Sequence, residues 1–242
     1  MIVAVTELVA KLRSLAVEKP DRITLFRGFS EAELDAFPVH LPEPERTLLG
    51  QVGAIMVDGL GFGPGADYVF TPADPAGASW PRLDWWSCNG PVDPGEAANA
   101  LEVHDPANGD FYYLNIDRET GAWGPILACS TDYEDAYAYL ATSLLSWWDR
   151  IADVLAAASS DDSWESVVHP WSFHDPDLEP RAWRDLRAEL SPAQQSALGD
   201  LDDDTQLIDL HRYTPPVSLE VFSPFTLECR LDGRFAIIRP RD

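Results

Sequence analysis

The chain is poor in positive charge. Its 242 residues include 17 lysines and arginines against 41 aspartates and glutamates, and Lys11 and Lys19 are the two lysines, so the formal net charge is −24. A field of this sign repels nucleic acid and anionic membrane surfaces and attracts cationic partners. Solubility, adaptation to salt or a biased genome would produce the same composition, so charge alone assigns no function.

Cysteine and long apolar runs are also scarce. The three cysteines are far apart and none has a neighbour at metal-ligand spacing, which predicts reduced thiols in a cytoplasmic protein. No apolar run approaches the roughly 20 residues that span a bilayer. The N-terminal segment carries Glu7, Lys11 and Arg13 among its apolar residues. That pattern indicates an amphipathic helix and not a signal peptide.

Motifs for catalysis or cofactor binding are missing. "GLGFGPG" at 59–65 has its third glycine misplaced for a dinucleotide loop, so a plain loop is favoured over a phosphate cradle. His169 and His174 are five residues apart with a proline between them, which is not metal-ligand spacing. We therefore expect no catalytic residue, no metal and no cofactor. A carboxylate-based hydrolase stays an alternative, because so many acidic residues supply acid–base pairs by chance.

Helical patterns occur in several places. Apolar residues at helical spacing predict a helix over 3–17, and Ser30 with Glu33 forms a capping box for a second one. Pro44 begins a short third helix. Residues 132–158 predict one long helix, with Trp147 and Trp148 buried side by side.

Strand patterns surround an aromatic hairpin. Phe111–Ile116 alternates as a strand, Asp117–Gly121 is a turn, and Ala122–Cys129 is the return strand. Residues 53–100 predict short strands and loops. Beyond the polar break at 159–163 we expect two helices, starting near Pro180 and at Pro192, and then strands joined by an Asp232-Gly233 turn. The chain therefore divides into a core over 1–157 and an extension over 158–242 that packs on it.

The hairpin and the helix behind it resemble the core of the SUKH superfamily, which contains fungal cell-wall-synthesis regulators and many bacterial immunity proteins. The resemblance covers roughly residues 25–157. Residues that fill the family pattern are Gly109, Phe111, Asp117, Gly121, Trp123, Gly124, Pro125 and Ser143-Leu144.

This resemblance implies an α+β fold, with a mostly antiparallel sheet and helices packed against it, and no enzymatic activity. Bacterial members are thought to bind and neutralise toxin domains, many of them nucleases. A basic toxin domain would suit a chain of charge −24. The resemblance thus implies an immunity protein that occludes a cognate toxin, and a regulatory or scaffold module is the alternative. The identity of the partner, the oligomeric state and the role of 158–242 stay open.

Acidic side chains beside the hairpin are the candidates for partner contact. Two lie in its turn, and three follow its return strand. They are Asp117, Glu119, Asp132, Glu134 and Asp135. The alternative for each is ordinary solvated surface, because most charges at the rim of an interface contribute little to affinity.

Overall fold

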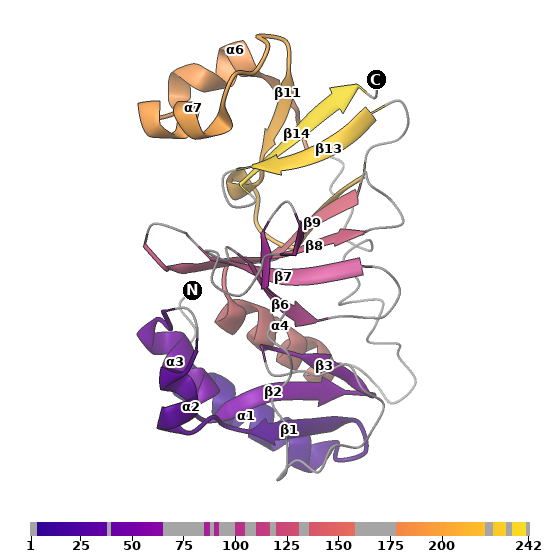
Figure 1. Cartoon of the computed structure of the whole chain (residues 1–242). Coiled ribbons are helices and arrows are strands. Elements are labelled where there is room, and N and C mark those ends of the chain that lie inside the picture. Colours follow the sequence, from indigo (N-terminus) through magenta and orange to yellow (C-terminus); the bar gives the residue numbers. More distant parts are fainter. Residues whose placement is uncertain are drawn as a thin grey trace.

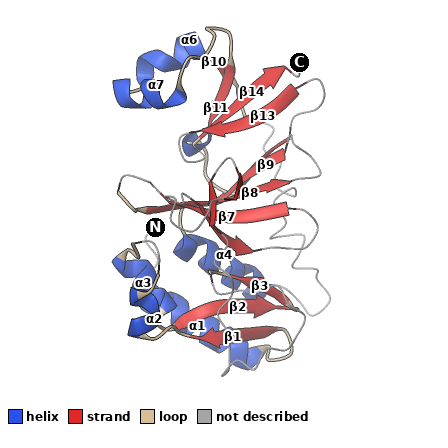
Figure 2. Cartoon of the chain, in the orientation of Figure 1, coloured by secondary structure: helices blue, strands red, loops and turns tan. Residues whose placement is uncertain are grey.

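A computed structural model describes residues 4–37, 40–64, 85–87, 90–91, 100–104, 110–116, 120–130, 136–157, 178–220, 225–230 and 234–240. These residues form three antiparallel sheets with helices packed against them, which confirms the predicted α+β class. Figure 1 shows the sheets following one another from the N-terminal unit, in indigo and purple, to the C-terminal unit, in orange and yellow. Helices lie at both ends of this arrangement and beside the central sheet (Figure 2).

The N-terminal unit combines three helices with a three-stranded sheet of order β1-β2-β3. Its elements are α1 (Val5–Glu18), β1 (Ile23–Arg27), α2 (Glu31–Asp35), α3 (Glu43–Leu49), β2 (Val52–Val57) and β3 (Leu60–Phe62). The predicted N-terminal helix is confirmed as α1. The predicted capping box is confirmed too, since Ser30 accepts a hydrogen bond from the Glu33 N–H and the Glu33 carboxylate accepts one from the Ser30 N–H.

The expectation of a plain loop at 59–65 is wrong for its first half, because β2 and β3 form a tight hairpin. Val57 pairs with Leu60, so Asp58 and Gly59 are the two turn residues. Both have positive φ, 49° and 90°, as a type I′ turn requires. The Gly63 N–H then donates to the Val103 carbonyl at 2.7 Å, which connects this hairpin to the central sheet.

The central sheet has seven strands in the order β12-β9-β8-β7-β6-β4-β5. Its strands are β4 (Trp85–Ser87), β5 (Gly90–Pro91), β6 (Ala100–His104), β7 (Asp110–Ile116), β8 (Trp123–Ser130), β9 (Ala136–Ala141) and β12 (Val217–Glu220). The predicted aromatic hairpin is confirmed as β7 and β8, which pair along their length. Strand β12 comes from the C-terminal segment and pairs with β9 at the sheet edge.

The prediction of one helix over 132–158 is wrong in its first part. Residues Ala136–Ala141 form β9, and helix α4 covers only Leu144–Ala157. Alanine favours helix, but the alternating Ala-Tyr pattern also suits a strand, and β9 gains pairing partners on both sides, β8 and β12. The helix begins after Ser143, whose hydroxyl accepts the Ser146 N–H at 3.1 Å. Trp147 and Trp148 are both buried, as predicted.

Both faces of the central sheet are buried where β7, β8 and β9 lie. On one face Tyr112, Leu114 and Ile126 join a large core with α1, α3 and α4. On the other face Leu127 and Tyr139 pack against strands of the C-terminal unit. This arrangement follows from the strand period of two, which points neighbouring side chains to opposite faces.

The two lysines of the chain both tie α1 to α4. The Lys11 ammonium lies 2.7 Å from the carboxylates of Asp149 and of Asp153. The Lys19 ammonium donates to the Leu155 carbonyl, close to the C-terminal end of α4. Positive charge at a helix C-terminus is favourable, because the last carbonyls lack partners within the helix.

The C-terminal unit is a four-stranded sheet of order β10-β11-β14-β13 with short helices. Its elements are β10 (Arg181–Ala182), α6 (Trp183–Leu186), η2 (Arg187–Glu189), α7 (Pro192–Leu198), β11 (Gln206–Asp209), η3 (Leu210–Arg212), β13 (Phe225–Arg230) and β14 (Phe235–Pro240). The helix predicted from Pro180 is interrupted by β10 and ends as a 3-10 turn, whereas the helix predicted at Pro192 is confirmed. The Asp232-Gly233 turn lies outside the described residues.

Gly63 tests the contact between the N-terminal sheet and the core. A Cβ added there would lie 2.5 Å from Cζ2 of the fully buried Trp148, and Gly63 has a φ of +123°. We expect Gly63→Ala to lower the free energy of unfolding by about 1–3 kcal/mol more than Gly59→Ala does. Gly59 is the matched control, because its φ is also positive but nothing lies within 4 Å of its added Cβ. Equal losses in urea denaturation would contradict this packing.

Candidate partner-binding surface

The acidic residues predicted to contact a partner lie outside the described residues. These are Asp117, Glu119, Asp132, Glu134 and Asp135. Among the residues that fill the family pattern, Gly109 also lies outside, and Phe111 is described in its backbone only. The structure therefore places the second strand of the hairpin and its surroundings, and we build the site from there.

The Trp-Gly-Pro segment forms a β-bulge. Leu114 pairs with Ile126 and Ile116 pairs with Trp123, so Gly124 and Pro125 together oppose the single residue Asn115. A Cβ on Gly124 would come within 3.4 Å of the Asn115 carbonyl oxygen, and Pro125 has no N–H to leave unpaired. The bulge bends the strand at this point, so the family-pattern residues here have a structural role.

The bent end of β8 lies against the segment between α2 and α3. The indole Nε1 of Trp123 donates to the His40 carbonyl at 3.0 Å. Gly121 has a φ of +69°, and an added Cβ there would lie 3.2 Å from the His40 Cβ. Trp123 is half-buried and His40 is exposed. The hairpin thus supplies an aromatic edge beside the two short helices.

Helices α2 and α3 carry an acidic surface next to this edge. The Arg46 guanidinium lies 2.5 Å from the Glu31 carboxylate and 2.6 Å from the Asp35 carboxylate. One cation therefore forms ion pairs with two carboxylates. Glu43 is exposed at the start of α3 and forms no ion pair with another described residue. We call Glu31, Asp35 and Glu43 the α2–α3 acidic face.

One carboxyl group of α3 is buried. Glu45 is 7% exposed, and burial raises its pKa above the usual value although its own backbone N–H partly offsets the shift. A buried carboxylate without a cationic partner is costly, and the protonated form avoids that cost. In the folded protein this group therefore retains its proton to higher pH than in the unfolded chain.

Nine of the thirteen lysines and arginines whose side chains the structure describes form ion pairs with described carboxylates. Every ion pair joins a cation to a nearby carboxylate. The paired cations are Lys11, Arg22, Arg27, Arg46, Arg181, Arg184, Arg187, Arg212 and Arg234. Exposed carboxylates that form no ion pair with a described cation also occur on both end units. They are Glu7, Glu18, Asp21, Glu43, Glu179, Asp185, Asp200 and Asp202.

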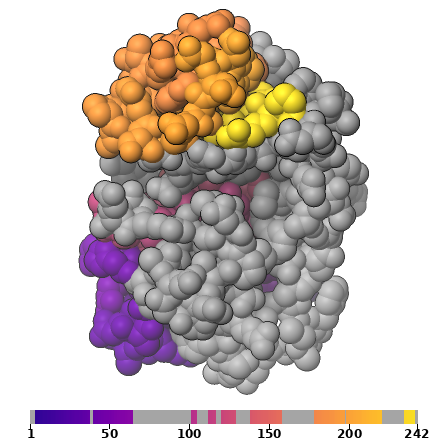
Figure 3. All heavy atoms as spheres, turned by 45° about the horizontal axis from the view of Figure 1, so that its top comes forward, coloured from indigo at the N-terminus to yellow at the C-terminus, as the bar shows by residue number. Residues whose placement is uncertain are grey.

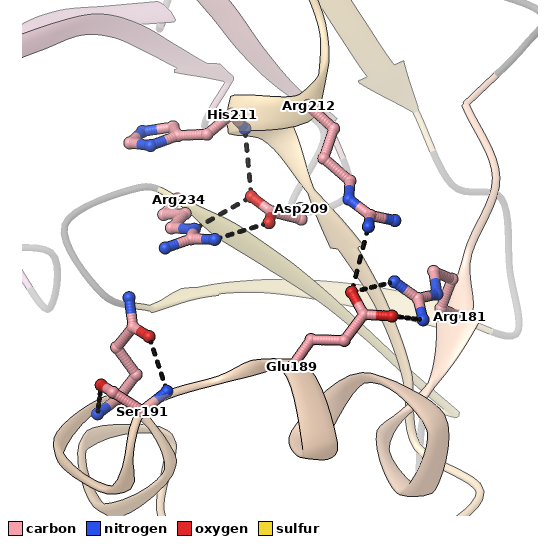
Figure 4. A network of polar contacts seen from close by, with 8 residues as sticks. Arg181, Glu189, Ser191, Asp209, His211, Arg212 and Arg234 are labelled. Atoms are coloured by element: carbon pink, nitrogen blue, oxygen red, sulfur yellow. Dashed lines mark hydrogen bonds and ion pairs between the residues drawn. The ribbon is translucent and has the colours of Figure 1, made fainter.

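A polar network stabilises the C-terminal unit (Figure 4). The Glu189 carboxylate forms ion pairs with the guanidinium groups of Arg181, at 2.6 Å, and of Arg212, at 3.0 Å. These ion pairs join η2 to β10 and η3. Asp209 is buried and receives two hydrogen bonds from Arg234, at 3.0 and 2.8 Å. The charged groups of this network find their partners within the same unit, so the network helps to hold β10, β11, η2 and η3 together.

The described residues offer little else of a chemical kind. No group of three or more His, Cys, Asp or Glu side chains among them could hold a metal ion. None of their helices is long and apolar enough to cross a bilayer. Figure 3 shows α6, α7 and their loops, in orange, gathered at one end of the visible face.

Glu45→Gln tests the buried carboxyl. Because the folded pKa of Glu45 is raised, stability decreases as pH rises from the unfolded pKa, near 4.3, through the folded one. The amide variant should gain about 1 kcal/mol or more at pH 7 and lose that advantage near pH 4. Urea titrations at both pH values measure this. Glu43→Gln, on the exposed side of α3, is the control, and equal behaviour of the two variants would contradict the assignment.

Salt should stabilise the protein at low ionic strength. A net charge of −24 repels itself, and added salt screens this repulsion over the whole surface, whereas only short-range pairs oppose the effect. We expect the melting temperature to rise by several degrees between about 10 and 150 mM NaCl, where the Debye length shortens from roughly 30 to 8 Å. Calorimetry measures this. A falling melting temperature would show that the ion pairs outweigh the repulsion.

Comparison with known proteins assigns no family to this chain. No family model, no curated protein and no solved structure matches it. The resemblance to the SUKH superfamily over residues 25–157 therefore stays a prediction, and the function is argued from the chain's own charge and geometry.

Proposed function

We propose that this protein is a non-enzymatic binding protein of the cytoplasm that neutralises a basic partner by stoichiometric occlusion, as a bacterial immunity protein does to its toxin. The observation that carries this proposal is the internal pairing of the cations. Since nine of the thirteen described lysines and arginines form ion pairs with carboxylates of the described residues, much of the scarce positive charge is already neutralised, and a set of exposed carboxylates faces solvent. A toxin of the nuclease type has a basic cleft, which is the complementary charge.

The α2–α3 acidic face is the part of this surface best suited to contact. The segment between its two helices holds the half-buried Phe37, and the His40 carbonyl of that segment accepts the indole N–H of the half-buried Trp123, so charge and apolar area occur in one region. Long-range attraction raises the association rate, while contacts of aromatic side chains slow dissociation. On the described surface Val17 is the exposed large hydrophobic residue, and it stands apart on α1.

The experiment uses a purified basic nuclease domain encoded beside this protein. We expect a one-to-one complex that blocks nuclease activity, with an association rate that falls at least tenfold between about 20 and 200 mM salt. Stopped-flow fluorescence measures the rate. A nuclease that is neither bound nor inhibited would contradict the proposal, and a stable complex with a partner other than a toxin would favour a regulatory scaffold.

A triple variant locates the interface. Glu31→Gln, Asp35→Asn and Glu43→Gln together remove three negative charges and free Arg46, so the association rate at low salt should fall by about tenfold. The matched control removes three charges from the C-terminal unit, as Glu179→Gln, Asp200→Asn and Asp202→Asn. An equal effect of both sets would show that net charge acts without a defined face.

A further inference from the structure

The C-terminal unit packs on the second face of the central sheet through a small apolar cluster. Leu127 of β8 and Tyr139 of β9 contact residues of β11, β12 and β14 there. His211 of η3 lies at the border of this cluster, and its ring stacks on the Tyr139 ring with centroids 5.9 Å apart and planes 29° apart. An ionisable ring from one unit therefore rests on an aromatic ring of the other.

The surroundings of His211 disfavour a positive charge. Two charged groups act on the ring: Arg234, which precedes β14, and the buried Asp209 of β11. Asp209 accepts two hydrogen bonds from Arg234. The Asp209 carboxylate accepts the backbone N–H of His211, at 3.2 Å, and Figure 4 shows the His211 ring directed away from it. Tyr113 and Tyr213 border the same cluster as neutral phenols.

We propose that protonation of His211 weakens the packing of the C-terminal unit on the central sheet, so that the contact between His211 and Tyr139 acts as a pH-sensitive latch. A cationic ring would lie on the edge of an apolar cluster and beside the Arg234 guanidinium. Loosening this contact would uncover Leu127 and Tyr139. The inference goes beyond the proposed function and does not depend on it.

The direction of the pH effect on docking follows from the difference in the His211 pKa between the docked and the undocked ring. Although His211 keeps exposed surface, partial desolvation of its ring lowers its pKa, and the positive charge of Arg234 lowers it further, while Asp209 opposes both. The undocked ring therefore binds a proton more readily than the docked one. Docking is at full strength above the ordinary pKa of about 6.5 and weakens as pH falls through that value toward the lowered one.

Two measurements on the full chain test the latch. A histidine NMR titration should place the His211 ring pKa below about 6.5, and Tyr139→Leu should move it upward. Hydrogen exchange should show the protection of β11 and β12 amides, such as those of Ile208 and Leu219, falling about three- to tenfold between pH 7.5 and 5.5. The amides of Leu8 and Leu12 in α1, far from the contact, should keep their protection.

Three variants separate the latch from a general effect of acid. His211→Gln should remove the pH dependence of the β11 and β12 amides, and His211→Lys should show low protection at both pH values. His40→Gln, another exposed histidine, should behave as the unchanged protein does. An unchanged pH dependence in His211→Gln, or a His211 ring that titrates at or above 6.5, would overturn the proposal, and the titration decides even if His211→Lys fails to fold.

Discussion

The structure depends on a central sheet that must bury both of its faces. Ile126 and Ala128 point into the core with α1 and α4, and Leu127 between them points to the opposite side. In a strand with apolar residues at three successive positions, each face carries at least one apolar side chain. Leaving either face in water would therefore expose apolar surface. The C-terminal segment buries the second face, because its strands cover Leu127 and Tyr139 and β12 pairs with β9 at the sheet edge. The described strands of the C-terminal segment are therefore part of the protein's core arrangement.

Local patterns predicted the elements whose signals lie close together in the sequence. The capping box at Ser30, the apolar stripe of α1 and the hairpin of β7 and β8 each depend on residues only a few positions apart. The Asp58-Gly59 pair is such a signal as well, but the glycines that follow it led to the prediction of a loop. Its meaning was available from the sequence, since this dipeptide between apolar runs favours a two-residue hairpin.

Other features could not be predicted because they depend on distant partners. Ala136–Ala141 has helical propensity as well as strand alternation, and the choice is made by pairing with β8 and with β12, which lies about 80 residues further along the chain. The bulge opposite Asn115 gives the Trp-Gly-Pro segment its structural role, and the docking of Trp123 on His40 joins residues 83 positions apart. The acidic contact residues predicted beside the hairpin lie outside the described residues and stay a prediction, and the acidic face on α2 and α3 is a separate feature of the described part.

The distribution of the cations connects stability with the acidic surface. Lys11 joins α1 to α4, Arg22 forms an ion pair with Asp58 at the β2–β3 turn, and Arg234 forms one with the buried Asp209. These cations therefore lie where structural elements meet. At these joints a cation offsets the repulsion that packed acidic elements would otherwise suffer. Other carboxylates of the described residues, such as Glu43 and Glu179, face solvent without an ion pair to a described cation. In a chain with so few lysines and arginines, the demands of folding alone thus produce an outward-facing negative field, and a basic partner would meet that field before any contact forms.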